Sequence, residues 1–599
     1  MTHPCNVTKM GTDDSQTREG AITAMSIPAL NPEQRAHDLQ AMESETLDVL
    51  VIGGGVTGAG SALDAATRGL RVGIVEAQDW ASGTSSRSSR LIHGGLRYLY
   101  NLDFALVAEA LAERGRLLTT LAPHLVKAQP FLWPLKQRVI ERAYSAVGVG
   151  LYDVLAVAGA GGRKTVPIQK HLTKAGAKEH FADVRDDALI GAIEFYDARV
   201  DDSRMVINLV RSAVRYGALA ASRTEVVGLL QDASGRVTGA RVKDLMDGRE
   251  FEIKARAVIN ATGVWTEATQ AYAKTDKGLK VLASKGIHIV VPRERINARS
   301  GMFLRTEKSV LFIIPWRHYW VIGTTDTAWH EQLKHPVPTS ADIDYVLDHA
   351  NAVLSANLTR DDIIGTYAGL RPLLQPVGSD EAKSAKVSRE HTTLEAAPGL
   401  TVIAGGKYTT YRVMAADAVD VALGQARAKQ LPSITKDVPL LGADGYSAYA
   451  RRADALASQY GWTSDMVADL LDRYGSELPA LLALVDTDPS LGQPLGASEW
   501  YLRADVAFAC RYEGALHLED ILIQRIRLNS TSPDRGASAV DEVAEIAAPL
   551  LGWDEARTEA EKANYRSRAE AEVAAQAEPT DAAASARRIE AEDMVPSDL

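Results

Sequence analysis

The chain has 599 residues, 46% of them apolar and 24% charged, a composition typical of globular proteins with a large buried core. Its 77 aspartates and glutamates outnumber 66 lysines and arginines, and the formal net charge of −11 argues against broad nucleic-acid binding. Two cysteines, Cys5 and Cys510, offer no disulfide framework and no cysteine metal site. We therefore expect a multidomain protein in a reducing, cytoplasmic setting, with no metal and no nucleic-acid partner.

Residues 1–45 are polar and mixed in charge, and they predict a disordered N-terminal extension. They have neither the apolar segment of a secretory signal nor the Arg-rich, acid-poor composition of a transit peptide. The sequence contains no run of 18 uncharged apolar residues, which argues against a membrane-spanning helix.

From Leu47 the pattern becomes strand, helix, strand: LDVLVIGGG, then VTGAGSALDAATRGL, then RVGIVEA. Gly53, Gly55 and Gly58 form a GxGxxG motif at the first turn, and Glu76 closes the second strand. Such a unit binds a dinucleotide, with the pyrophosphate at the helix N-terminus and the acid on a ribose diol. The motif alone is weak, and an ordinary glycine-rich turn is the alternative. The two strands, the helix and the acid together favour the dinucleotide.

Residues 103–121 predict a helix with apolar positions at Phe104, Val107, Leu111 and Leu118. The middle of the chain then alternates strand-like runs with polar connections, which predicts an α+β insertion on an α/β base. These runs are ALIGAIEFY, KARAVINATG, KGIHIVV, SVLFIIPW and YWVIGTTD.

The C-terminal third changes character after Pro432. Consecutive helical patterns with glycines at several ends predict a separate all-α domain over 433–553. Residues 554–599 are rich in alanine and glutamate and poor in aromatics, and we predict that they form a disordered tail.

Two later glycine elements favour FAD over NAD. AVINATGVW places a strand before Ala261 and Gly263, and GLTVIAGGKYTTYR places another before Gly405 and Gly406. An extended FAD can be held from both ends of the chain, and its flavin ring needs a second set of backbone donors.

Several segments occur in the order expected of FAD-dependent glycerol-3-phosphate dehydrogenases of the respiratory, quinone-linked type, and the sequence resembles the bacterial aerobic members of this family. The resemblance is dense over 46–430 and looser to about 550. The segments are DVLVIGGGVTGAG, GTSSRSSRLIHGGLRYL, RVDDSRMV, NATGVW, KGIHIVVPR, IPWRHYWVIGTTD, GLRPLL and GGKYTTYR.

The resemblance implies a Rossmann-like FAD-binding domain similar to those of glutathione reductase and D-amino-acid oxidase. This α/β domain would be discontinuous, with an inserted α+β substrate-binding domain and the all-α C-terminal domain after it. The FAD-binding parts would be about 46–127, 200–270 and 360–430, and the inserted parts about 128–199 and 271–359.

The resemblance also implies that the segment SSRSSRLIHGGLRYL lines the flavin and the substrate pocket. Gly94 and Gly95 would let the chain pass close to the flavin ring, and Arg97 would reach the substrate phosphate beside Tyr98. For His93 we favour a buried histidine that satisfies a local backbone group over a catalytic one. The remaining expected cofactor contacts are Thr84, Ser85, Ser86, His93, Ala261, Gly263, Gly406, Lys407 and Thr409.

Three residues further along the chain complete the expected pocket. His288 sits on an alternating strand, opposite in direction to Ile287 and Ile289; a half-buried structural histidine is the alternative to the catalytic base that the resemblance implies. Arg371 is either a surface arginine or a second phosphate ligand. Lys407 could reach the substrate phosphate or the flavin edge, and both assignments stay open.

The implied function is oxidation of sn-glycerol 3-phosphate to dihydroxyacetone phosphate, with FAD passing the electrons to a membrane quinone. An oxidase that uses O2 and a non-catalytic flavin-binding protein are the alternatives. We expect a cytoplasmic protein held at the inner face of the cell membrane, with 131–158 as the candidate contact and a helix packed on the core as the competing interpretation. A homodimer fits the family, and the sequence does not decide the oligomeric state. Thr325 and Asp326 are either pocket wall or a strand-end turn.

Overall fold

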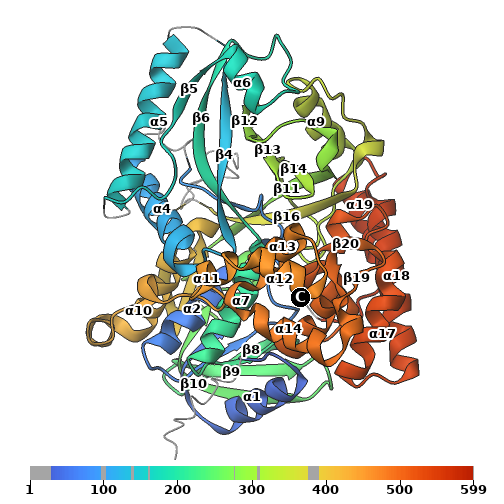
Figure 1. The fold of residues 1–599 in the computed structure, drawn as a ribbon. Helices are drawn as coiled ribbons and strands as arrows, with labels where there is room; N and C mark the ends of the chain where they lie inside the picture. Colours follow the sequence, from blue (N-terminus) through green and yellow to red (C-terminus); the bar gives the residue numbers. More distant parts are fainter. Residues whose placement is uncertain are drawn as a thin grey trace, which may run out of the picture.

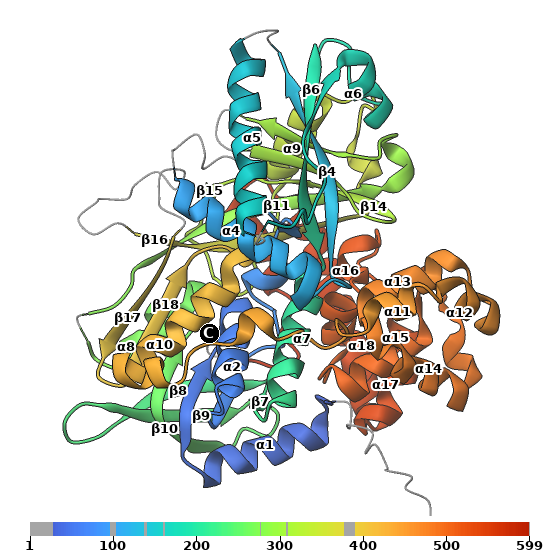
Figure 2. The same ribbon diagram turned by 60° about the vertical axis from the view of Figure 1, so that its left-hand side comes forward.

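The computed structural model describes residues 28–95, 103–136, 140–159, 162–275, 277–306, 310–375 and 390–597, without the side chains of 140–147. Two large sheets lie one above the other in Figure 1, and the C-terminal helices, in orange and red, pack beside both. Figure 2 shows the same helices from a second side, against α7 (Asp202–Arg215).

The first sheet is built on parallel strands and is buried on both faces. Val49 and Val51 of β1 face one apolar cluster, and Leu50 and Ile52 face another, as expected for a parallel sheet covered on both sides. The order is β17-β18-β10-β1-β2-β7, with β9 on β10 and β8 on β9. The bounds are β1 Leu47–Ile52, β2 Val72–Val75, β7 Leu219–Ala221, β8 Thr224–Gln231, β9 Val237–Asp244, β10 Glu250–Asn260, β17 His391–Ala397 and β18 Leu400–Gly405.

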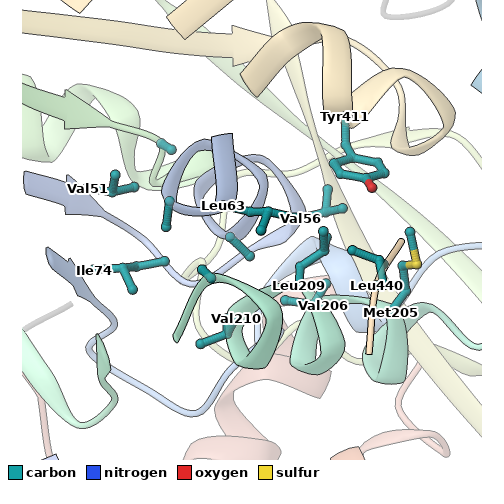
Figure 3. Packing of buried hydrophobic residues seen from close by; sticks show 14 of the residues in the cluster. Val51, Val56, Leu63, Ile74, Met205, Val206, Leu209, Val210, Tyr411 and Leu440 are labelled. Carbon is teal, nitrogen blue, oxygen red and sulfur yellow. The ribbon is translucent and has the colours of Figure 1, made fainter. Parts of the chain in front are cut away.

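Three helices form the core on one face of this sheet: α2 (Val56–Thr67), α7 and α10 (Tyr411–Gln430). Figure 3 shows Leu63 of α2, Val206 of α7 and Tyr411 of α10 in one apolar cluster with Val51 of β1 and Ile74 of β2. Because α2 is fixed from both sides, the N-terminus that follows the glycine loop is held rigidly.

The second sheet is mostly antiparallel, and it carries the strand pair that matters for the site. β11 lies between β14 and β16, and β16 runs antiparallel to β11 along its whole length. The bounds are β3 Leu91–Ile92, β4 Val126–Leu135, β5 Lys170–Thr173, β6 Gly191–Val200, β11 Val281–Pro292, β12 Gly301–Arg305, β13 Val310–Pro315, β14 Tyr319–Gly323, β15 Thr327–Ala328 and β16 Gly365–Leu374.

The strand β16 corrects a predicted domain boundary. We assigned 360–430 to the FAD-binding domain, but β16 belongs to the second sheet. The chain returns to the first sheet only at β17. Strand periodicity cannot reveal this exchange, because pairing partners far apart in sequence decide which sheet a strand joins.

The C-terminal helices dock on α7 through buried ion pairs. Arg204 of α7 pairs with Glu513 at 2.7 Å, and Arg211 pairs with Glu477 at 2.7 Å. The helices are α11 Tyr446–Ala450, α12 Ala453–Tyr460, α13 Ser464–Tyr474, α14 Leu478–Thr487, α15 Arg503–Tyr512, α16 Leu528–Thr531 and α17 Val540–Leu551, with a small hairpin of β19 Pro494–Leu495 and β20 Ser498–Leu502.

Both predicted disordered ends are wrong where the structure describes them. In place of a free N-terminal extension, α1 (Pro32–Ser44) is capped by Asn31 and buries Leu39 and Met42 under the first sheet. In place of a tail, α18 (Glu555–Ala575) and α19 (Asp581–Ile589) pack on the molecule. Composition did not reveal the docking of α18 and α19, because it does not show the partners of their ion pairs, Arg568 with Glu519 and Asp581 with Lys285. Residues 1–27 lie outside the described part.

The candidate membrane segment 131–158 is divided between a strand and a helix. Phe131 and Trp133 belong to β4, Tyr152 belongs to α5 (Ile140–Gly159), and all three are buried in one apolar cluster. They therefore cannot contact lipid, which corrects the prediction for these aromatics. No helix in the described ranges is long and apolar enough to cross a membrane.

The helix predicted over 103–121 is present as α4 (Phe104–Arg116), continued by a wider turn to Leu121. Val107 and Leu111 are buried, whereas Phe104 is exposed at the first turn. The remaining helices are α6 Lys174–His180, α8 Thr266–Ala271 and α9 Ser340–Asn351.

Candidate active site

The glycine loop between β1 and α2 has the close contacts that its sequence predicts. Gly53 has a φ of +108°, and a Cβ there would lie 2.8 Å from the Ala261 carbonyl oxygen. At Gly58 an added Cβ would overlap the carbonyl oxygen of Gly53, so only glycine fits. Gly55 precedes the first turn of α2, and a Cβ there would meet only the Ser85 hydroxyl, at 3.2 Å. A phosphate can therefore approach the helix N-terminus at Gly55.

Glu76, at the end of β2, binds the backbone beside this loop. Its carboxylate accepts hydrogen bonds from the N–H groups of Gly54 at 2.6 Å and Gln78 at 2.7 Å. Burial raises the pKa of Glu76, and the two N–H groups oppose that rise by favouring the charged form. Glu76 also lines the cleft described next. Its contact with a ribose diol stays a prediction.

One cleft joins the glycine loop, the end of β2 and the loop after β18. Its volume is about 300 Å³. Ten of the predicted cofactor residues line it, together with His288 and Arg371. The ten are Gly53, Gly55, Glu76, Thr84, Ser85, His93, Ala261, Gly263, Gly406 and Lys407.

Gly94 and Gly95 are not among the residues that line the cleft. The N–H of Gly94 donates to the Tyr152 hydroxyl at 2.8 Å, and a Cβ on Gly94 would overlap Leu111. Gly95 has a φ of +77°. Packing against α4 and α5 thus requires a glycine at 94, and the place of Gly94 and Gly95 beside the flavin ring stays a prediction.

Ser86 and Thr409 support the cleft from behind. Ser86 is buried, and its carbonyl accepts a hydrogen bond from Arg527 at 2.9 Å. The Thr409 hydroxyl accepts from the His93 N–H and donates to the His93 carbonyl, both at 3.1 Å. Thr409 therefore fixes the backbone of His93. Ser86 and Thr409 are not among the residues that line the cleft. Arg97 and Tyr98 lie outside the described residues.

His288 faces the cleft from the middle of β11. Ile287 and Ile289 belong to the apolar cluster on the other side of the sheet, as the alternating pattern predicts. The Nε2 atom of His288 lies 2.9 Å from the Ser89 hydroxyl. The imidazole stacks on Tyr367 of β16, with ring centroids 4.8 Å apart.

The electrostatic surroundings keep this imidazole neutral. Burial lowers the pKa of His288 well below its ordinary value, and the guanidinium groups of Arg371 and Arg90 lower it further. Within the described ranges, its Nδ1 atom is buried without a hydrogen-bond partner. A neutral imidazole in a cleft can accept a proton from a bound hydroxyl group.

Arg371 is held against the cleft wall and is not a surface arginine. Its guanidinium donates to the Thr324 hydroxyl at 2.9 Å and to the Thr325 carbonyl at 3.1 Å, and it lies 3.5 Å from the Asp326 carboxylate. Gly286 provides the space, because a Cβ there would overlap the guanidinium. Thr325 and Asp326 do not line the cleft, so they form a strand-end turn that positions Arg371.

Lys407 enters the cleft directly after two glycines. Gly405 and Gly406 both have a φ of +78°, and they turn the chain from β18 toward α10. A Cβ on Gly406 would lie 2.5 Å from the Met414 sulfur, so the loop passes close to α10. This backbone route places Lys407 opposite the glycine loop of β1 in the same cleft.

Sequence reasoning missed four residues of the cleft or its wall. Gln78 and Trp265 line the cleft, Ser89 contacts His288, and Tyr367 stacks on it. Ser89 was visible as one more hydroxyl in the serine-rich segment. Tyr367 had no local signal, because only the pairing of β11 with β16 places it beside His288.

The cleft fits FAD. Gly53 and Gly58 are positions that a Cβ would fill, and the N-terminus of α2 opens into the cleft at Gly55. Glu76 supplies an acceptor at one end, and the turn at Gly406 supplies backbone groups at the other. Beyond the cofactor residues, the cleft offers a neutral imidazole and a fixed guanidinium, which suit proton abstraction from an anionic substrate.

Comparisons with known proteins agree with this arrangement. The chain matches the FAD dependent oxidoreductase family over residues 48–412 and the C-terminal domain of alpha-glycerophosphate oxidase over 433–558. It is 52% identical over 563 residues to glycerol-3-phosphate dehydrogenase 2 of Mycobacterium tuberculosis, covering 94% of this chain and 95% of that protein. It is 35% identical over 546 residues to the mitochondrial glycerol-3-phosphate dehydrogenase of Homo sapiens, and this match covers 88% of this chain and 73% of the human protein.

Among solved structures, the chain resembles the glycerol-3-phosphate dehydrogenase from Bacillus halodurans complexed with FAD. The TM-score is 0.72 at 26% sequence identity, and the match covers 90% of this chain and 98% of that one. Together, these matches confirm the predicted fold class and FAD as the cofactor.

Proposed function

Because the chain belongs to the family of FAD-dependent glycerol-3-phosphate dehydrogenases, we propose that it oxidises sn-glycerol 3-phosphate to dihydroxyacetone phosphate. FAD, bound in the cleft, takes up the hydride that leaves C2 of the substrate. One observation carries the proposal: His288 and Arg371 project into the same cleft from the neighbouring strands β11 and β16.

His288 is the proposed base. When C2 loses its hydride, the 2-hydroxyl group must lose its proton, and the neutral imidazole of His288 can take it. Ser89 and Tyr367 hold the ring, one by a hydrogen bond and the other by stacking. A dianionic phosphate near Arg371 would offset the positive charge that lowers the pKa of His288, so substrate binding would make the imidazole a stronger base.

Arg371 is the proposed phosphate ligand of the described cleft. A planar guanidinium can donate to two phosphate oxygens at once, and Thr324 and Thr325 already fix its orientation. We assign Arg97, Tyr98 and Lys407 to the same substrate pocket, as the family resemblance implies. Lys407 would either bind the phosphate or stabilise negative charge on the reduced cofactor.

We further propose that the electrons pass to a quinone, and that the protein works at the inner face of the cell membrane. The support is that the similar proteins from M. tuberculosis and H. sapiens are named dehydrogenases, the latter mitochondrial. An oxidase that uses O2 is the second candidate, because residues 433–558 match a domain named for alpha-glycerophosphate oxidase.

One experiment separates these functions. Anaerobic addition of sn-glycerol 3-phosphate should bleach the flavin absorbance, and a water-soluble quinone should restore it faster than air does. Faster reoxidation by air with stoichiometric peroxide would instead identify an oxidase. If the flavin keeps its colour with substrate, the protein is a flavin-binding protein without this activity. Liposomes that contain quinone, compared with empty ones, test the membrane-bound acceptor.

A further inference from the structure

A second cavity, next to the flavin cleft, is lined by six arginines. We refer to it as the arginine cavity, and its volume is about 50 Å³. Glu572 is the one acidic residue among the described residues that line it. The arginines come from the segment after β2, from the loops around α16, and from α18 and α19. They are Arg87, Arg90, Arg527, Arg535, Arg568 and Arg588.

Three of these arginines have carboxylate partners. Arg527 pairs with Asp202, Arg568 pairs with Glu519 at 2.5 Å and with Glu572 at 3.0 Å, and the same Glu572 lies 3.6 Å from Arg588. Glu572 is thus shared by two guanidinium groups. These ion pairs give three of the six arginines a carboxylate counterion.

The other three, Arg87, Arg90 and Arg535, have no carboxylate partner within the ranges that the structure describes, and Arg90 donates to the hydroxyl groups of Tyr319 at 2.7 Å and Ser530 at 3.2 Å. Arg535 is 3% exposed and donates only to uncharged oxygens, among them the Thr366 hydroxyl at 2.7 Å and the Asn529 carbonyl at 3.1 Å. The side chain of Arg87 makes neither a hydrogen bond nor an ion pair there. Burial lowers the pKa of Arg87 to about 10, and repulsion from Arg568 adds to this effect.

Buried guanidinium groups gathered in this way are costly unless an anion compensates them. Their planar, multiply donating geometry matches the oxygens of a tetrahedral oxyanion. A volume of about 50 Å³ exceeds what one water needs and suits a small group. We propose that the arginine cavity binds a small oxyanion of the phosphate class, either inorganic phosphate or the phosphate of a monoester.

This cavity is distinct from the places assigned to the FAD pyrophosphate and the substrate phosphate. Those places lie in the flavin cleft, at Gly55 and Arg371, and neither residue lines the arginine cavity. One residue, Arg87, lines both the flavin cleft and the arginine cavity. Its backbone carbonyl would be 2.7 Å from a Cβ on Gly369, so the wall between the two spaces is thin there.

A bound oxyanion would also act on His288, a consequence that rests on the proposed function. Tyr367 lines the arginine cavity and stacks on His288, and Arg90 lies over the Tyr367 ring at 5.2 Å. The titratable groups that face His288 are Tyr367 and Arg371 of β16, and Arg90 next to Ser89. An anion beside Arg90 would offset its positive charge and strengthen His288 as a base.

Binding is tested with the FAD-loaded protein, so that the pyrophosphate position is filled. Titration calorimetry with inorganic phosphate, at ionic strength held constant with chloride, should be done in an Arg371→Ala background to remove the substrate position. We expect one phosphate per chain. Arg535→Gln should weaken binding by about 10- to 100-fold, since a buried charge-assisted contact is lost. Glu572→Gln should tighten it, and the exposed Arg185→Gln should leave it unchanged.

Arg535→Gln should weaken phosphate binding and Glu572→Gln should tighten it, so the result is decisive even if one variant folds poorly. Should Arg535→Gln unfold, as judged by circular dichroism, the variants Arg535→Lys and Glu572→Gln decide instead. Equal phosphate affinity in wild type, Arg535→Lys and Glu572→Gln would overturn the proposal, as would absence of binding. Dihydroxyacetone phosphate in place of inorganic phosphate distinguishes the two sources: at least tenfold tighter binding identifies a monoester.

The effect of the bound anion on His288 is measured separately from phosphate binding. The pH profile of flavin reduction should shift its acid limb upward when phosphate is present, and Arg535→Gln should remove that shift. Phosphate binding without any shift would leave the anion site intact and refute only the link. Failure of substrate to reduce the flavin would refute the proposed function and leave the calorimetric result standing.

Discussion

The glycine loop and the strand pair β11–β16 build the same cleft by opposite means. The loop works through missing side chains: Gly53 and Gly58 have no room for a Cβ, and the backbone and the N-terminus of α2 face the cleft proposed for the cofactor. The strand pair works through side chains that are present, His288 on one strand and Arg371 on the other. One region is therefore damaged by adding atoms and the other by removing them.

The largest effect is expected at the base. His288→Ala should slow flavin reduction by about 10²- to 10⁴-fold, because no other group then accepts the hydroxyl proton. Stopped-flow absorbance under anaerobic conditions measures this rate at saturating substrate. Ser89→Ala, which removes only the hydrogen bond to the ring, is the matched control and should be much milder. Reduction of the histidine variant at the wild-type rate would exclude His288 as the base.

The second-largest effect is expected at Arg371 on β16. Arg371→Ala should weaken substrate binding by about 2–4 kcal/mol, since a charge-assisted contact to phosphate is lost. The dissociation constant follows from the substrate dependence of flavin reduction, and the limiting rate should change less. A variant with unchanged affinity would mean that other residues bind the phosphate. The same change at Arg97, outside the described residues, tests whether the two arginines share this role.

In the glycine loop, adding one methyl group should be enough to lower both stability and FAD content. Gly58→Ala should lower the free energy of unfolding by about 1–3 kcal/mol and reduce the FAD content, because its Cβ would overlap the Gly53 carbonyl. Gly148→Ala in α5, where a Cβ meets nothing within 4 Å, is the control. Thermal unfolding and the absorbance ratio at 450 and 280 nm give the two readouts. A fully yellow, equally stable Gly58→Ala protein would contradict the assigned role of the loop.

The smallest effect concerns pH. Because burial and nearby arginines lower the pKa of His288, protonation of the free enzyme should reduce kcat/KM only below pH of about 6.5, the ordinary value for histidine. Removing one of the arginines, in Arg371→Ala, should move this acid limb to higher pH. A limb that stays in place would show that Arg371 does not contribute to the field at His288.

The two regions also differ in how well the sequence predicted them. The glycine loop is local: strand, turn, helix and acid follow each other within 30 residues, and each of Gly53, Gly55, Gly58 and Glu76 was predicted. In the strand pair, His288 and Arg371 were identified through family resemblance. Their neighbour Tyr367 was missed because only the pairing of β11 with β16 places it beside His288. The packing of Gly94 against Leu111 was not predicted either, because α4 meets this turn only in the folded protein.

The sequence by itself determined the βαβ unit with its glycine loop and acid, and the helical character of the C-terminal region. Those features depend on short-range periodicity and on glycine geometry, which a chain carries wherever it folds. Tertiary structure alone decided that β16 leaves the first sheet, that α1, α18 and α19 dock on the molecule, and that six arginines meet in one cavity. The reason is physical: buried ion pairs and strand pairing join residues far apart in the sequence. Composition shows which charged residues are present, but not which of them pair.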